Sequence, residues 1–119
     1  MSSLAGTHAI TLDQGASFSL LMVWRNKRTK EPISLVGYTA RMKVKAKTTG
    51  YPLLKTLTTE NGGITLGGVE GSITLTMSDE ETAALKAGTH SYDLELEDAS
   101  GHVTKLLRGS FVVRREVTD

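Results

Sequence analysis

The sequence predicts an all-β fold, an antiparallel β-sandwich of seven to nine short strands with one short helix near residues 79–86. Three observations lead to this prediction. Apolar and polar residues alternate over most of the chain, which is the period of a strand with one buried face. Turn signals recur about every ten residues, as in antiparallel sandwiches. A single capping pattern indicates the helix.

The first half of the chain carries two strong strand patterns. A short strand at residues 8–12 comes first. One face of the next strand then carries four apolar side chains, Phe18, Leu20, Met22 and Trp24. Leu21 and Val23 are apolar too, so we expect this strand to be covered on both faces. A polar loop at 25–32 leads to a regular alternation at 38–47, which predicts a half-buried strand.

Weaker strands and the helix follow. A strand at 53–59 leads into the turn dipeptide Asn61-Gly62, and residues 64–77 predict a hairpin. Residues 78–81 have the Ser-x-x-Glu spacing of a capping box, in which each side chain bonds the backbone N–H of the other residue. A helix therefore starts here. We expect it to end at Gly88, because glycine favours the left-handed conformation of a helix stop.

Two further strand patterns complete the chain. In residues 92–97 apolar side chains alternate with acidic ones, and the last strand or pair of strands spans 103–113. A short helix before a strand that begins with tyrosine is typical of an immunoglobulin-like sandwich, so we predict that topology. Trp24 and Tyr38 are expected in its core. Tyr92 resembles the tyrosine of a tyrosine corner, in which the hydroxyl bonds upstream backbone, so we expect it to lock the sandwich.

One domain accounts for the chain. Its 119 residues suit a single core, and residues 8–113 form the predicted sandwich. Residues 1–7 are then an N-terminal arm, and residues 114–119 are a C-terminal tail. The longest apolar run, residues 20–24, is far shorter than the roughly 20 residues that cross a bilayer. We therefore expect no membrane partner.

The residue types predict no chemical site. Cysteine is absent, which removes disulfides, zinc–thiolate sites and thiol nucleophiles. His8, His90 and His102 match no metal-binding spacing such as H-E-x-x-H. No G-x-S-x-G motif marks a nucleophilic serine. We therefore expect no enzymatic activity, no catalytic or metal-binding residue, no cofactor and no small-molecule ligand.

Opposite charges gather in the two halves of the chain. Residues 1–60 carry a surplus of basic side chains, and residues 61–119 carry a surplus of acidic ones. The main basic ladder is Arg41, Lys43, Lys45 and Lys47. It has the spacing of a phosphate track, but the chain has few aromatic side chains to stack on bases, so nucleic acid is disfavoured. A surface for a protein partner is a second interpretation. The immunoglobulin-like topology favours a third, in which the ladder lies opposite Asp93, Glu95 and Glu97 on a solvated face.

Several stretches of the chain resemble a known family. The resemblance rests on residues 10–18, Trp24, residues 32–42, residues 85–96, Gly101 and residues 106–109. These stretches are similar to small phage tail and baseplate proteins, and to the N-terminal domain of phage baseplate upper proteins. The resemblance implies an immunoglobulin-like sandwich that docks onto a tail. It also implies a location in the virion, after assembly in the host cytoplasm.

On this resemblance we expect a non-enzymatic virion component, a tail or baseplate adaptor that contacts other virion proteins and copies of itself. A capsid decoration or head-completion protein is one alternative. A free carbohydrate- or peptide-binding sandwich is another. The candidate partner contacts are Arg25, Lys27, Arg28, Lys30, Arg114 and Arg115. The residues expected to have structural roles are Trp24, Tyr38, Tyr92 and Gly88.

Overall fold

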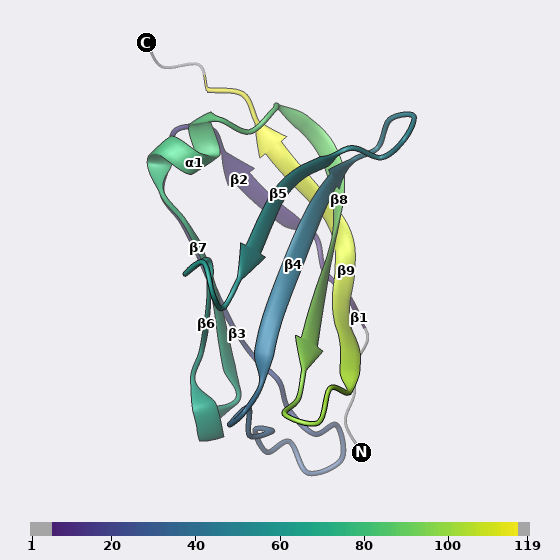
Figure 1. Ribbon diagram of the computed structural model, residues 1–119. Coiled ribbons are helices and arrows are strands. Elements are labelled where there is room, and N and C mark those ends of the chain that lie inside the picture. The colour runs from purple at the N-terminus through teal and green to yellow at the C-terminus, as the bar shows by residue number, and fades with distance from the viewer. Residues whose placement is uncertain (1–5, 117–119) are drawn as a thin grey trace.

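Two β-sheets stacked face to face contain the strands that the alternating pattern predicts, together with a short strand, Gly6–Thr7, inside the predicted N-terminal arm (Figure 1). The computed structural model describes residues 6–116. The larger sheet holds β1 (Gly6–Thr7), β2 (Ile10–Asp13), β4 (Thr39–Ala46), β5 (Leu53–Thr58), β8 (Gly88–Glu97) and β9 (Val103–Arg114). The smaller sheet holds β3 (Phe18–Val23), β6 (Ile64–Leu66) and β7 (Ser72–Met77). A short 3-10 helix spans Gly68–Glu70, and α1 spans Asp79–Ala83.

The strand order is immunoglobulin-like. The smaller sheet runs β3-β7-β6, while β4, β8 and β9 are neighbours in the larger sheet. This is the division of strands between two sheets that defines the immunoglobulin fold, so the predicted fold class is confirmed. The larger sheet is mixed, however, and not purely antiparallel. Both β1 and β2 run parallel to β9, with Ile10 opposite Phe111.

The core lies between the two sheets and draws on both. Its fully buried side chains include Met42, Leu75, Leu94 and Phe111. Trp24 is buried as predicted, and the half-buried Tyr38 meets its ring edge-on with centroids 6.1 Å apart. Such an aromatic pair adds about 0.5–1.5 kcal/mol beyond the area that it buries. The predicted core is therefore confirmed at these positions.

The helix is shorter than predicted. The capping box forms as expected, with Ser78 Oγ accepting from the Glu81 N–H and Glu81 accepting from the Ser78 N–H. The helix then ends at Ala83, and Gly88 is the first residue of β8 instead of the helix stop. The helix stops early because Leu85 must turn into the core, where it is buried. Gly88 does adopt a positive φ of 137°, at the entry to the strand.

Tyr92 bonds upstream backbone, as predicted, although its acceptor is far away in the sequence. Tyr92 is buried, and its hydroxyl donates to the backbone carbonyl of His8, 84 residues upstream. The reason is that the chain between β1 and β2 passes directly over Gly109, the residue that pairs with Tyr92. A carbonyl from the N-terminal segment is therefore the acceptor of the Tyr92 hydroxyl.

The outer face of β3 is also exposed, where the sequence predicted cover on both faces. Leu21 is 64% exposed and Val23 is 36% exposed. No described element packs on that face, because residues 78–88, which follow β7, turn toward the end of the sandwich (Figure 1). Within residues 6–116 no helix is long and apolar enough to span a membrane.

Candidate functional site

The site begins with the outer edge of β3. The smaller sheet ends at this strand, so within the described residues only β7 is hydrogen-bonded to it. The Trp24 N–H donates to Gly71 O at 2.9 Å, just past the end of β3. Hydrogen-bonded pairs alternate along an antiparallel ladder, so the even-numbered residues of β3 bond to β7. The backbone groups of Ser19, Leu21 and Val23 therefore point out from the edge.

The other sheet edges in the described part of the chain are protected against pairing. Strand β5 carries Lys55, and its register with β4 shifts between Val44 and Lys45. Strand β6 has three residues, and the β1–β2 edge is interrupted at His8 and Ala9. Short strands, lysines and bulges are the usual devices that prevent edge-to-edge association. By contrast, β3 has six residues and contains no charge, no proline and no glycine.

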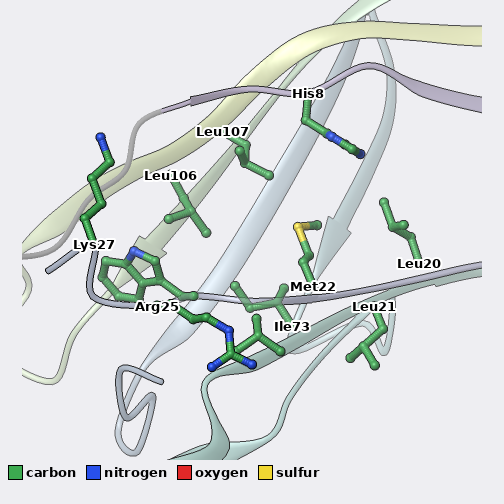
Figure 2. A pocket seen from close by; sticks show the side chains of 11 residues that line it. His8, Leu20, Leu21, Met22, Arg25, Lys27, Ile73, Leu106 and Leu107 are labelled. Atoms are coloured by element: carbon green, nitrogen blue, oxygen red, sulfur yellow. The ribbon is translucent and has the colours of Figure 1, made fainter. Parts of the chain in front are cut away.

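An apolar groove runs beside this edge. It has a volume of about 450 Å³ and separates β3 from the N-terminal segment and β9. Figure 2 shows Met22 from β3 and Leu107 from β9 projecting into it from opposite sides, with Ile73 at its floor. The groove exists because β1 and β2 pair with β9, which leaves no strand of residues 6–116 beside this edge of β3. Leu20 and Met22 are consequently only half-buried, although both face the core.

A basic loop lies where β3 ends. Arg25, Lys27, Arg28 and Lys30 are all exposed there, so the structure brings these four predicted contact residues together. The side chain of Asn26 accepts from the N–H groups of Arg28 and Thr29, and Arg25 Nη1 donates to Lys30 O at 3.0 Å. These bonds give the loop a defined shape. Arg25 and Lys27 also line the groove, which therefore has a cationic rim.

The two C-terminal candidates lie elsewhere. Arg114 ends β9 and pairs with Asp13 at the opposite end of the sandwich, through bonds of 2.6 and 3.2 Å. This bond lowers the pKa of the Asp13 carboxyl and raises the pKa of the Arg114 guanidinium. Arg115 is exposed beside it. The predicted set of six therefore divides into two groups, and two members of the first, Arg25 and Lys27, line the groove.

An acidic rim lies where β3 begins. Helix α1 carries Asp79, Glu80 and Glu81 and is fixed to the turn before β3 by Thr82, which is buried. The Gly15 N–H donates to Thr82 Oγ1 at 3.0 Å, and the hydroxyl donates to Ala16 O at 2.9 Å. Lys55 bonds Glu81 at 2.8 Å and lowers the pKa of that carboxyl. Strand β3 thus runs from an acidic end to a basic end.

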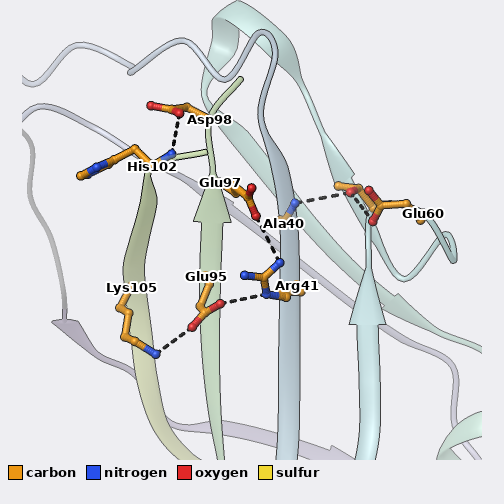
Figure 3. A network of polar contacts seen from close by, with 9 residues as sticks. Ala40, Arg41, Glu60, Glu95, Glu97, Asp98, His102 and Lys105 are labelled. Carbon is orange, nitrogen blue, oxygen red and sulfur yellow. Dashed lines mark hydrogen bonds and ion pairs between the residues drawn. The ribbon is translucent and has the colours of Figure 1, made fainter. Parts of the chain in front are cut away.

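The charge ladder on the larger sheet is an ion network, as predicted. Arg41 pairs with Glu95 at 2.9 Å and with Glu97 at 3.3 Å, and Lys105 pairs with Glu95 at 2.7 Å (Figure 3). The register places Lys43 opposite Asp93. Lys45 lies opposite Ser91 and not opposite an acidic residue. Of the three basic residues Arg41, Lys43 and Lys45, only the first two therefore have an acidic partner directly across on β8. This face holds the two strands in register.

The three histidine side chains lie in three different environments. His90 is buried, and its Nε2 lies 2.8 Å from Lys86 O. His8 lines the groove, and His102 is exposed in the turn before β9. Among the described residues, no group of three His, Cys, Asp or Glu side chains is placed to hold a metal ion.

Comparison with known proteins shows a likeness in structure but none in sequence. No family model and no curated protein sequence matches the chain. The structure is similar to that of CopC from Methylosinus trichosporium OB3b, with a TM-score of 0.47 and 13% sequence identity. The match covers 98% of this chain and 90% of that one.

This finding corrects the predicted identity. The match runs over nearly the whole chain to CopC and not to a baseplate protein, so the resemblance to phage tail and baseplate proteins was wrong. The predicted role as a virion component and the predicted location in the virion are withdrawn with it. The quoted stretches lie on strands and turns that recur in β-sandwiches, and this shared architecture explains why they suggested the wrong family.

The groove and the open edge were not found from the sequence. One signal pointed to them. Leu21 and Val23 make both faces of β3 apolar, and this pattern led to the prediction that both faces of the strand are covered. Whether a strand of the described chain lies beside β3 depends on where β1 and β2 pair, and short strands of this kind carry no sequence mark of their partner.

Proposed function

We propose that this chain is a non-catalytic protein-interaction module that accepts an extended segment of a protein partner along β3. The observation that carries the proposal is an uncharged six-residue edge beside an apolar groove. Natural sheets protect such edges unless something pairs with them. The other edges of the described chain are protected, so this one is the exception.

Strand addition uses two kinds of contact, and β3 offers both. The outward backbone groups of Ser19, Leu21 and Val23 can exchange hydrogen bonds with an added strand. Alternate side chains of that strand would then enter the groove between Met22 and Leu107. The first contact supplies affinity for any extended backbone, and the second selects apolar side chains at every other position.

The basic rim adds a preference for charge. Arg25 and Lys27 line the groove where β3 ends, and both are exposed. An acidic residue in the bound segment would meet these cations at that end. The structure thus favours an extended segment in which apolar residues alternate and an acidic residue follows at one end.

A peptide selection tests this proposal. Random linear peptides displayed on yeast are selected for binding to the immobilised protein. The sequences of the selected peptides should show alternating apolar residues with an acidic residue at one end. Trp24, the single tryptophan, lines the groove, so its fluorescence should change when a peptide binds. The amides of Ser19, Leu21 and Val23 should become protected from hydrogen exchange.

The matched variants are Leu21→Lys and Leu53→Lys. Both replace an exposed leucine, one on β3 and one on β5. Binding should weaken about tenfold or more with a lysine on β3, because lysine blocks an edge, and should persist with a lysine on β5. Peptides that bind both variants equally, and leave Trp24 fluorescence unchanged, would contradict the proposal.

A further inference from the structure

We infer that the segment received by β3 is β3 of a second copy, so that two chains form a symmetric dimer with a continuous six-stranded sheet. The inference rests on the proposed function, because it names the partner of the same edge. Three features of the strand and its two ends support it. They are its register, its lack of charge, and the opposite charges at its two ends.

A two-fold axis through Leu21 gives a consistent register. Two copies of β3 would then pair antiparallel, with Leu21 opposite Leu21 and Ser19 opposite Val23. These are the three residues whose backbone groups point out from the edge. Every outward donor and acceptor of the strand then finds a partner. The same side chains lie on the exposed outer face, where Leu21 of each copy would cover the other.

The strand also meets no repulsion from its own copy. Residues 18–23 contain no charged side chain, so pairing with itself places no like charges opposite each other. In a two-fold dimer the same patch faces its own copy, so a charged residue near the axis would meet a like charge.

The charged ends are complementary in the antiparallel arrangement. Figure 1 shows α1 and the loop that follows β3 at opposite ends of the sandwich. When the strands run in opposite directions, the acidic rim of one copy (Asp79 and Glu80) lies at the end that carries the basic loop of the other (Arg25 to Lys30). This occurs twice in a symmetric dimer. A parallel arrangement would instead bring like charges together.

Sedimentation of the full chain over a range of concentrations tests for the dimer. We expect a monomer–dimer equilibrium in the wild type. Leu21→Lys places two lysines opposite each other at the two-fold axis and should raise the dissociation constant at least about tenfold. Leu53→Lys should leave it unchanged. Circular dichroism of each variant separates loss of dimer from loss of fold.

A charge exchange tests the antiparallel arrangement itself. One variant carries Lys27→Glu and Arg28→Glu, and another carries Asp79→Lys and Glu80→Lys. Each alone should dimerise at least about tenfold more weakly than the wild type, because the first loses the net positive charge of the loop and the second reverses the charge of the acidic rim, so the attraction at both ends is lost. A mixture of the two should recover the dimer, since the introduced glutamates of one then meet the introduced lysines of the other, and the unchanged acidic rim of the first meets the unchanged basic loop of the second.

The outcomes separate the two proposals. A monomer at every concentration that still binds selected peptides at β3 would overturn the inference and leave the proposed function intact. A dimer that Leu21→Lys does not weaken, or a charge-exchanged mixture that fails to recover, would also overturn it. If selected peptides ignore β3 and the dimer is absent, both proposals are wrong.

Discussion

The Tyr92 hydroxyl donates a hydrogen bond to the backbone carbonyl of His8, which lies 84 residues away in the sequence. It joins the middle of β8 to the segment between β1 and β2. The His8 N–H donates to Arg108 O at 3.1 Å, so the backbone N–H and the backbone carbonyl of His8 are both hydrogen-bonded. These bonds fix the N-terminal segment to the larger sheet. The edge of β3 stays open for that reason.

Tyr92→Phe should lower the free energy of unfolding by about 1 kcal/mol, the usual net value of one hydrogen bond. Phenylalanine keeps the ring and its edge-on contact with Phe111, so packing should change little. Urea unfolding measures the difference. Tyr51→Phe is the control, because the side chain of Tyr51 is 65% exposed and should contribute nothing. Equal stability of the two variants would show that the bond to His8 is unimportant.

The same hydroxyl makes stability depend on alkaline pH. Burial raises the pKa of Tyr92 to about 12 from an ordinary value of 10.0. The folded chain therefore favours the protonated hydroxyl. The resulting contribution to the free energy of unfolding is fully present below pH 10. It is lost as the pH rises from 10 toward 12. The wild type should lose its advantage over Tyr92→Phe across that range, and a constant difference between them would contradict this account.

Gly109→Ala should destabilise the fold by about 1–3 kcal/mol, because the N-terminal segment crosses directly above this residue. A Cβ at this position would lie 2.5 Å from His8 O and 3.2 Å from His8 N. The segment must move away, which weakens the Tyr92 bond as well. Thermal unfolding measures the loss, and hydrogen exchange at His8 should increase. The control Ser110→Ala changes the next residue and should have little effect.

The sequence and the structure agree where one strand's own pattern decides the outcome. The alternation around Met42 and the capping box at Ser78 depend on local residues, and both were predicted correctly. The open edge depends instead on which strand pairs with β9, which is a choice between distant segments. The acceptor of Tyr92 was missed for the same reason, since His8 reaches it only through that pairing.

Glu95→Gln should cost about 0.5–1 kcal/mol at neutral pH, the range for a partly exposed ion network. The bond from Lys105, with a further bond from Arg41, holds the pKa of the Glu95 carboxyl below its ordinary value of 4.5. The carboxylate therefore stabilises the folded state above pH 4.5, and this is lost as the pH falls through the lower folded value. Urea unfolding at pH 7 and pH 3 should show the difference shrinking in acid. Glu31→Gln, at an exposed loop position, is the control.

Thr82→Val tests whether a buried hydroxyl fixes α1 beside the start of β3. Valine has nearly the same shape but removes the acceptor of the Gly15 N–H and the donor to Ala16 O. We expect a loss of about 1 kcal/mol or more, because the half-buried Gly15 N–H loses the acceptor that the buried Thr82 hydroxyl supplies. Thr65→Val, at an exposed position of β6, should be neutral. If the hydroxyl also sets the position of Asp79 and Glu80, Thr82→Val should weaken the dimer without any change in charge. A variant that loses stability but dimerises as tightly as the wild type would show that the acidic rim is positioned by packing alone.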